Sequence, residues 1–293
     1  MHDANPIHWR QVILSLSPAA LLLGIFFGAY AIFLFYSVHP PATGGAAADA
    51  GWTLKYYLRY FASANERNTL WRTFVISVEL TLACIVIGYP MAYVMVRSQS
   101  SFLRKFLIVS LVVTFLSGTV TRAYAWLIIL GNRGLINTLL MKIGLTDSPL
   151  HLVYNETGVF ISLLHFVLPF FVLTMMGPLK NIPRSLEDAA INLGAGRLRC
   201  FLLVTLPMSV PGLVAAGSLA FAVALSSFLF PLVLGGGRFR MVSNAIYEHI
   251  FQAFDVPMAA ASASVFLVIS LLFFWGFGVL QRMVGQGPTN QAH

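Results

Sequence analysis

The chain has 293 residues, of which 58% are hydrophobic and only 10% are charged. A soluble domain carries roughly 25% charged residues and a disordered chain still more, so this composition excludes both classes and predicts an integral membrane protein. The net charge of +8 indicates contact with anionic lipid or with partners at the membrane face, and no basic run interleaved with aromatic residues suggests nucleic-acid binding.

Long stretches with few or no charged residues predict an all-α protein with six transmembrane helices. A helix needs about 20 apolar residues to cross the hydrocarbon core of a bilayer. The strands of a membrane β-barrel would instead give short segments of alternating polarity. The predicted spans are residues 17–38, 72–96, 106–130, 157–178, 209–234 and 259–281.

An even number of spans places both termini on one side of the membrane. Nine cations fall on each side of the predicted topology, so the count itself does not decide the orientation. The short loop from Arg97 to Lys105 contains three cations and no acid, and it favours a cytoplasmic location for both termini.

Three outer loops, residues 39–70, 131–156 and 235–258, connect the predicted spans. The first and the third contain aromatic or apolar residues at helical spacing. The second is expected to form a short helix near residues 135–143 that ends at Gly144.

The longest inner loop, residues 179–208, is predicted to carry a short exposed helix. Pro183 cannot continue the preceding helix. Ser185 is a suitable N-cap, and Asp188 three residues later completes an approximate capping box. Gly194 can adopt the left-handed conformation that ends a helix.

The surface of this helix leaves two interpretations open. Ala189 and Ala190 form a face of small residues that another surface can approach closely. Leu186, Ala190 and Leu193 share one side of the helix. The helix either docks into a groove of a partner or serves as a solvated linker.

The same stretch resembles the EAA loop of permease subunits of bacterial ABC importers. The pattern of that loop is E-A-A, a glycine four residues after the second alanine, and a hydrophobic-proline pair. In that family the helix couples transport to ATP hydrolysis by seating in a cleft of the ATPase subunit. The resemblance implies an ATPase-coupling site composed of Ser185, Leu186, Glu187, Asp188, Ala189, Ala190, Leu193, Gly194, Leu206 and Pro207.

Residues 89–93, 122–126 and 234–237 further resemble the spermidine/putrescine permease branch of these importers. The resemblance implies a type I ABC importer permease fold, formed as one transmembrane domain over residues 1–293 with a core of about residues 70–283. It also implies a multi-pass protein of the bacterial inner membrane that imports a polyamine or a related organic cation. The alternative is a secondary transporter or channel, which would show inverted repeats and several intramembrane charges.

The partners that the resemblance implies are a second permease subunit of similar fold, two ATP-binding subunits, a periplasmic substrate-binding protein and membrane lipid. The chain contains no GxxxxGK[ST] phosphate loop, no HExxH and no GxSxG. We therefore expect no enzymatic activity, no metal and no cofactor in this chain, and ATP with Mg²⁺ in the partner ATPase.

Glu79 lies inside the second predicted span, where a carboxylate is costly and indicates a functional site. It is a candidate contact for a cationic substrate, and the alternative is a structural ion pair with Arg72 or Arg122. Aromatic residues in the second and third spans either contribute to the same site or belong to the interfacial belt. The candidate substrate-pathway residues are Glu79, Tyr89, Tyr93, Tyr124 and Trp126.

Overall fold

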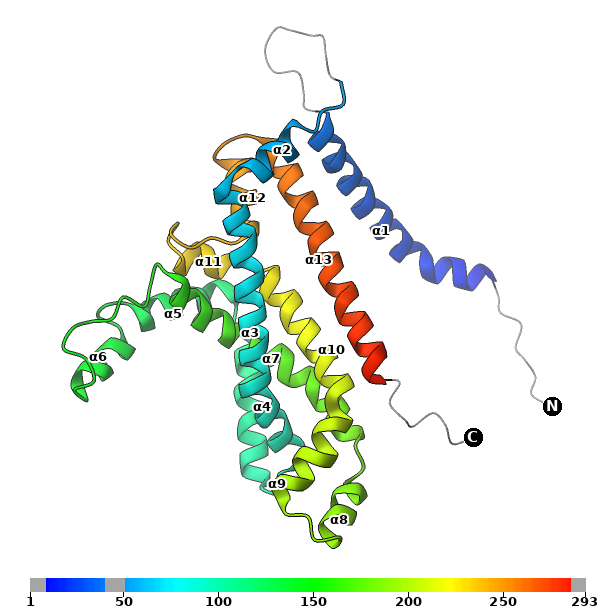
Figure 1. The fold of residues 1–293 in the computed structure, drawn as a ribbon, viewed down its shortest axis with the longest axis vertical. Coiled ribbons are helices and arrows are strands. Elements are labelled where there is room, and N and C mark those ends of the chain that lie inside the picture. The colour runs from blue at the N-terminus through cyan, green and yellow to red at the C-terminus, as the bar shows by residue number, and fades with distance from the viewer. Residues whose placement is uncertain (1–8, 40–50, 286–293) are drawn as a thin grey trace. The chain divides into compact units, whose positions relative to one another are not determined.

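The computed structural model describes residues 9–39 and 51–285, and nearly all of these residues lie in helices (Figure 1). The helices are α1 (Trp9–Val38), α2 (Lys55–Ala62), α3 (Ala64–Arg97), α4 (Ser101–Leu116), α5 (Thr119–Leu130), α6 (Leu135–Lys142), α7 (Glu156–Asn181), α8 (Arg184–Asn192), α9 (Arg197–Cys200), the π-helix η1 (Phe201–Thr205), α10 (Leu206–Leu225), α11 (Leu229–Leu234), α12 (Val242–Phe251) and α13 (Val256–Gly285). The prediction of an all-α membrane protein is confirmed.

Five helical segments of the described chain are long and apolar enough to cross a membrane. They are Ser17–Val38, Ala64–Arg97, Glu156–Asn181, Arg197–Leu225 and Val256–Met283. A sixth span exists only if α4 is joined to the segment Thr119–Lys142, from which it is bent by 105°. The third predicted span, residues 106–130, is therefore formed by two helices that meet at a sharp bend and not by one continuous helix.

Arg122 explains the bend between α4 and α5. Its guanidinium donates to the carbonyl oxygen of Thr114 and, at 2.8 Å, to that of Ser117. Both carbonyl groups lie at the end of α4, where a helix leaves its last carbonyl oxygens without helical partners. That of Thr114 also accepts from the hydroxyl of Ser117 at 2.7 Å. The side chain also lies over the ring of Phe166, 5.3 Å from its centroid. A buried arginine thus stabilises the end of α4 where a continuous helix was expected.

The predicted fifth span, residues 209–234, is likewise interrupted. Helix α10 ends at Leu225, and α11 begins at Leu229. Between them, the carbonyl oxygen of Ser227 accepts a hydrogen bond from Ser243 at 2.6 Å, and that of Phe228 accepts one from Asn244 at 3.0 Å. Phe228 also accepts from the backbone nitrogen of Leu232 at 3.1 Å, so the side chains of a distant segment add hydrogen bonds to the carbonyl groups at this break.

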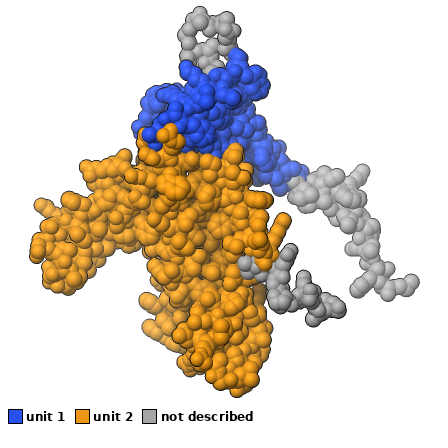
Figure 2. Space-filling model, viewed as in Figure 1, with its two compact units in different colours: residues 1–64, 246–265 blue, residues 65–245, 266–293 orange. Residues whose placement is uncertain are grey.

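The described chain divides into two compact units (Figure 2). Unit 1 comprises the described residues up to 64 and residues 246–265. Within it, the hydroxyl groups of Ser37 and Tyr57 lie 2.8 Å apart, and Arg59 forms an ion pair with Asp255 at 2.8 Å. Helix α2 is the amphipathic helix expected in the first outer loop; residues 40–50 of that loop lie outside the described residues.

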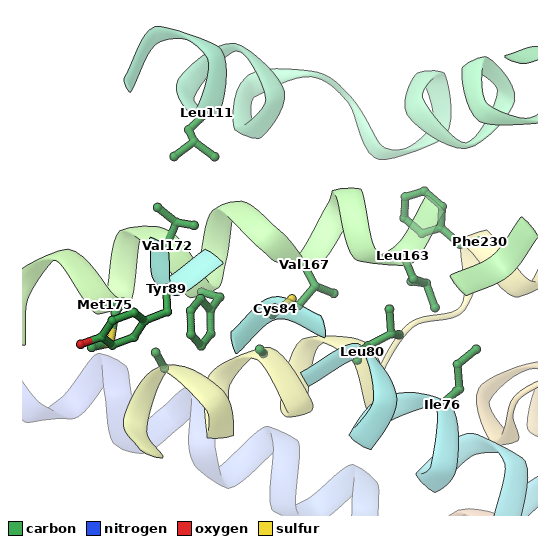
Figure 3. Packing of buried hydrophobic residues seen from close by; sticks show 14 of the residues in the cluster. Ile76, Leu80, Cys84, Tyr89, Leu111, Leu163, Val167, Val172, Met175 and Phe230 are labelled. Carbon is green, nitrogen blue, oxygen red and sulfur yellow. The ribbon is translucent and has the colours of Figure 1, made fainter. Parts of the chain in front are cut away.

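Unit 2 comprises residues 65–245 and 266–285 and contains the main hydrophobic core. Helix α7 packs against α4, α5, α10 and α11. Figure 3 shows Leu80 and Cys84 of α3 facing Leu163 and Val167 of α7. Small side chains such as Ala216 on α10 complete this buried cluster, because they let membrane helices approach closely.

Helix α8 lies at one end of unit 2, beyond the last turns of α3 (Figure 1). The opposite end of the unit contains the beginning of α3 and helix α11 (Figure 1). The 34 residues of α3 make it about 51 Å long, which exceeds the roughly 30 Å hydrocarbon core. The two ends of unit 2 therefore lie on opposite sides of a membrane that α3 crosses.

Candidate functional site: the inner loop and the exposed residues of the spans

Helix α8 begins and ends close to the positions that the sequence predicted, but a different residue occupies its N-cap. Pro183 occupies the N-cap position, and Ser185 lies exposed inside the first turn, so the prediction of Ser185 as the N-cap is wrong. The missing amide hydrogen of Pro183 and its restricted φ suit the residue that precedes a helix. Gly194 has a φ of +87° and ends the helix as predicted, since its backbone nitrogen donates to Ile191 at 2.9 Å.

The outward surface of α8 is partly apolar. The side chain of Leu193 is 90% exposed, and those of Leu186 and Ile191 are exposed by 40% and 48%. Asp188 and Ala189 also lie on the exposed surface. A short helix with exposed leucines, isoleucine and a carboxylate offers a surface suited to a protein partner.

Glu187, by contrast, points into the protein. Its Oε1 atom lies 3.0 Å from Nε of Arg97 at the end of α3, and only 15% of the Glu187 side chain and 9% of the Arg97 side chain are exposed. The same oxygen accepts a hydrogen bond from the hydroxyl of Thr205, in the π-helix, at 2.9 Å. Glu187 therefore connects α8 to two membrane helices at once.

Further hydrogen bonds strengthen this connection. Arg97 also donates to the carbonyl oxygen of Ile182 at 2.8 Å, just before α8. Arg184 donates to the carbonyl oxygen of Val96 at 3.2 Å. Arg97 was counted among the inner cations, but the sequence did not identify it as the partner of Glu187, because 90 residues separate the two.

Two of the candidate pathway residues lie beside this cluster. The hydroxyl of Tyr89 lies 2.7 Å from that of Ser209, and Tyr89 is buried. The rings of Tyr89 and Tyr93 contact Phe201 of the π-helix edge to face, at centroid distances of 5.7 and 5.2 Å. In this conformation both tyrosines pack α3 against the start of the span Arg197–Leu225.

The other three candidates lie apart from these tyrosines. Glu79 is exposed on α3, about 15 Å along the helix from Tyr89. Tyr124 is exposed on α5, and Trp126 donates to His165 at 3.2 Å. The structure thus does not gather the five candidate pathway residues at one site.

Glu79 forms no ion pair within the part of the chain that the structure describes. Of its two expected alternative partners, Arg122 is engaged at the bend after α4. Its neighbours along the same face of α3, Leu82 and Val86, are exposed apolar residues. A carboxylate within a span is costly when it faces lipid, so such residues face protein or a water-filled cavity.

Comparison with known proteins identifies the class of the chain. Residues 84–286 match the family described as binding-protein-dependent transport system inner membrane component. This match covers more than half of the sequence, so the chain belongs to this family.

Individual relatives agree with this assignment. The chain is 29% identical over 198 residues to the spermidine/putrescine transport system permease protein PotB of Escherichia coli (strain K12), covering 67% of this chain and 72% of that protein. It is 27% identical over 234 residues to the inner membrane ABC transporter permease protein YdcU of the same organism, covering 75% and 74%. The resemblance to polyamine permeases seen in the sequence is confirmed.

Two solved structures share the fold. A bacterial ABC transporter involved in the import of the acidic polysaccharide alginate matches with a TM-score of 0.75 at 18% identity, covering 93% of this chain and 95% of that chain. The MetNI methionine ABC transporter matches with a TM-score of 0.57 at 16% identity, covering 76% and 99%. The type I importer permease fold is thereby confirmed.

The chain is thus an inner-membrane, multi-pass permease subunit of an ABC importer. As a member of this family it is a transport component and not an enzyme. Among the described residues, no group of three or more His, Cys, Asp or Glu side chains is placed to hold a metal ion.

Proposed function

We propose that this permease imports a polyamine or a related organic cation, and that α8 couples transport to ATP hydrolysis in a partner subunit. The observation that supports the coupling proposal is the difference between the two sides of α8. Its outward side, with Leu193 and Asp188, is exposed, while its inward side is joined through Glu187 to two spans.

The proposed assembly contains a second permease of similar fold, two ATP-binding subunits and an external substrate-binding protein. ATP and Mg²⁺ bind in the ATPase partner. Both termini lie in the cytoplasm, as does α8. Closure of the ATPase subunits moves α8, and the contacts of Glu187 carry that motion to α3 through Arg97 and to α10 through Thr205.

The π-helix η1 suits this role. Its five residues connect the inner loop directly to α10, with no break in the helical path. A π-helical turn is rare within an α-helix and recurs at functional sites. The aromatic contacts of Phe201 with α3 give the same segment a second link to the neighbouring span.

The test of coupling uses the assembled importer in proteoliposomes. Leu193→Glu and Asp188→Lys place a wrong charge on the outward side of α8, and we expect both to weaken ATPase-subunit binding and to lower ATP-driven uptake. Leu145→Glu is the matched control, since Leu145 is 68% exposed on the second outer loop. Normal ATPase binding and uptake in both α8 variants would contradict the proposal.

The substrate class is supported by the names of the relatives and by Glu79, a carboxylate placed within a span. A carboxylate attracts the ammonium groups of a polyamine. The test is to measure which solute, presented by the external binding protein, raises the ATPase rate of the complex. Stimulation by neutral or acidic solutes alone would contradict the polyamine proposal, and full-rate uptake without ATP would favour a secondary transporter.

A further inference from the structure

A polar pocket of ≈ 430 Å³ lies at the end of unit 2 opposite α8. Its lining consists of Asn65, Asn68, Thr69, Arg72, Gly237, Arg238 and Arg240. Three guanidinium groups and two carboxamides thus face one space. Arg240 is paired with Glu66 at 4.0 Å. The lining residues themselves include three arginines and no carboxylate, so the pocket is lined by positive charge.

The pocket has a fixed frame. Arg238 and Arg240 flank Phe239, which is 2% exposed, and Met241 beyond them is fully buried. The backbone nitrogen of Met241 donates to the side chain of Asn244 at 3.1 Å. The next residue, Val242, donates from its backbone nitrogen to the hydroxyl of Thr73 on α3 at 3.0 Å.

Glycines complete this frame. Gly236 and Gly237 have φ values of +54° and +75°, which side chains rarely permit. A Cβ atom on Gly235 would lie 2.1 Å from the carbonyl oxygen of Phe239. The turn that presents the two arginines therefore requires glycine, and the arginines are held on a rigid support rather than on a free surface loop.

The pocket lies on the outer side of the membrane if α8 is cytoplasmic. Arg72 and Arg97 are 25 residues apart on α3, or about 37 Å at the helical rise, which exceeds the roughly 30 Å hydrocarbon core. Outer loops normally contain fewer Arg and Lys residues than inner loops. Three of the nine outer cations, Arg72, Arg238 and Arg240, line this one pocket.

We infer that this pocket, which we call the arginine pocket, receives carboxylate side chains of the external substrate-binding protein when that protein docks. The forked guanidinium of arginine binds carboxylates through two parallel hydrogen bonds. The arginine pocket repels a cationic solute. The ligand of the arginine pocket is therefore distinct from the solute that Glu79 is proposed to attract. The inference rests on the proposed partnership with a binding protein and names the surface on which that partner is seated.

Docking of this kind also gives the arginine pocket a role in the transport of a cation. Before docking, the cluster of arginines opposes the approach of a free organic cation from outside. When acidic residues of the binding protein occupy the arginine pocket, the positive charge is neutralised. The outer entrance is thus favourable to a cation only while its delivery protein is seated.

The experiment measures the dissociation constant between the assembled importer in nanodiscs and its own binding protein. The variant is Arg72→Gln with Arg238→Gln, since neither arginine forms an ion pair within the described residues. Arg240 is left unchanged because it pairs with Glu66. Arg133→Gln, at an exposed cation of the second outer loop, is the matched control.

We expect the affinity to fall about tenfold for each arginine removed. We also expect the affinity of the variant to depend less on salt than that of the unchanged importer. The basal ATPase rate and the melting temperature should not change, which separates this result from misfolding and from failure of the α8 coupling. An unchanged dissociation constant would overturn the inference. Binding of inorganic phosphate or succinate to the unchanged importer but not to the variant, with docking intact, would assign the arginine pocket to a small anion instead.

Discussion

The side chains of Arg97 and Glu187 meet at 3.0 Å where the end of α3 faces the first turns of α8. The sequence placed Glu187 among residues that contact an ATPase. The structure turns this carboxylate towards the membrane helices and leaves Asp188 and Leu193 on the outward surface. Within the proposed coupling site, Glu187 is therefore a positioning residue that fixes α8 to the spans.

This ion pair predicts a charge-swap result. Arg97→Glu and Glu187→Arg should each destabilise the chain, because each leaves two like charges in a largely buried site. The double variant should recover part of the loss, with an interaction free energy of about 0.5–3 kcal/mol. The measurements are the melting temperature in detergent and the number of solutes imported per ATP.

The control for the swap is Asp188→Asn, which leaves the ion pair intact and should not change the melting temperature. If the double variant lost as much stability as the two single variants together, the connecting role of Glu187 would be refuted. Equal damage from Asp188→Asn would place the effect on the outward surface instead.

Gly212 on α10 predicts a steric effect on helix packing. A Cβ atom there would lie 2.3 Å from Cβ of Pro178 on α7, and a proline ring cannot rotate away. Gly212→Ala should therefore force the two helices apart, with a cost of about 1–3 kcal/mol. The matched control on the same helix is Gly217→Ala, whose new Cβ would meet Thr81 at an ordinary 3.6 Å. Equal melting temperatures for the two variants would contradict this packing.

Arg122 predicts a requirement at the bend after α4. Arg122→Leu keeps an apolar side chain at the site but removes the guanidinium that donates to the carbonyl oxygen of Ser117 at the end of α4. The expected cost is about 1–3 kcal/mol for the lost donor. Arg122→Lys should recover only part of this, because an ammonium group cannot reproduce the planar fork. Thermal unfolding monitored by circular dichroism checks the order arginine, lysine, leucine.

Glu79 predicts an effect on uptake without an effect on folding. Glu79→Gln should raise the KM for an organic cation, because the negative charge that attracts the substrate is lost. The protein should assemble normally, since Glu79 forms no ion pair within the described residues. Asp147→Asn, at an exposed acid on the second outer loop, is the control. An unchanged KM would show that Glu79 has no role in the pathway.

The sequence was sufficient for the class of protein and for most of its helices. Runs of uncharged residues locate membrane helices because burying a charge in hydrocarbon is costly at any position along them. The end of α8 at Gly194 was also predictable, since the left-handed conformation favours glycine locally. These features depend on residues that are near each other in the chain.

The tertiary structure decided the features that depend on distant residues. The third span bends because Arg122 reaches back to α4, and α10 stops early because Ser243 and Asn244 bind the carbonyl groups beyond it. The sequence likewise did not predict the partner of Glu187 or the pocket that several outer arginines line together. Composition and local propensity determine that helices form in a membrane, whereas the direction of a polar side chain depends on which groups the packing of those helices brings within hydrogen-bonding distance.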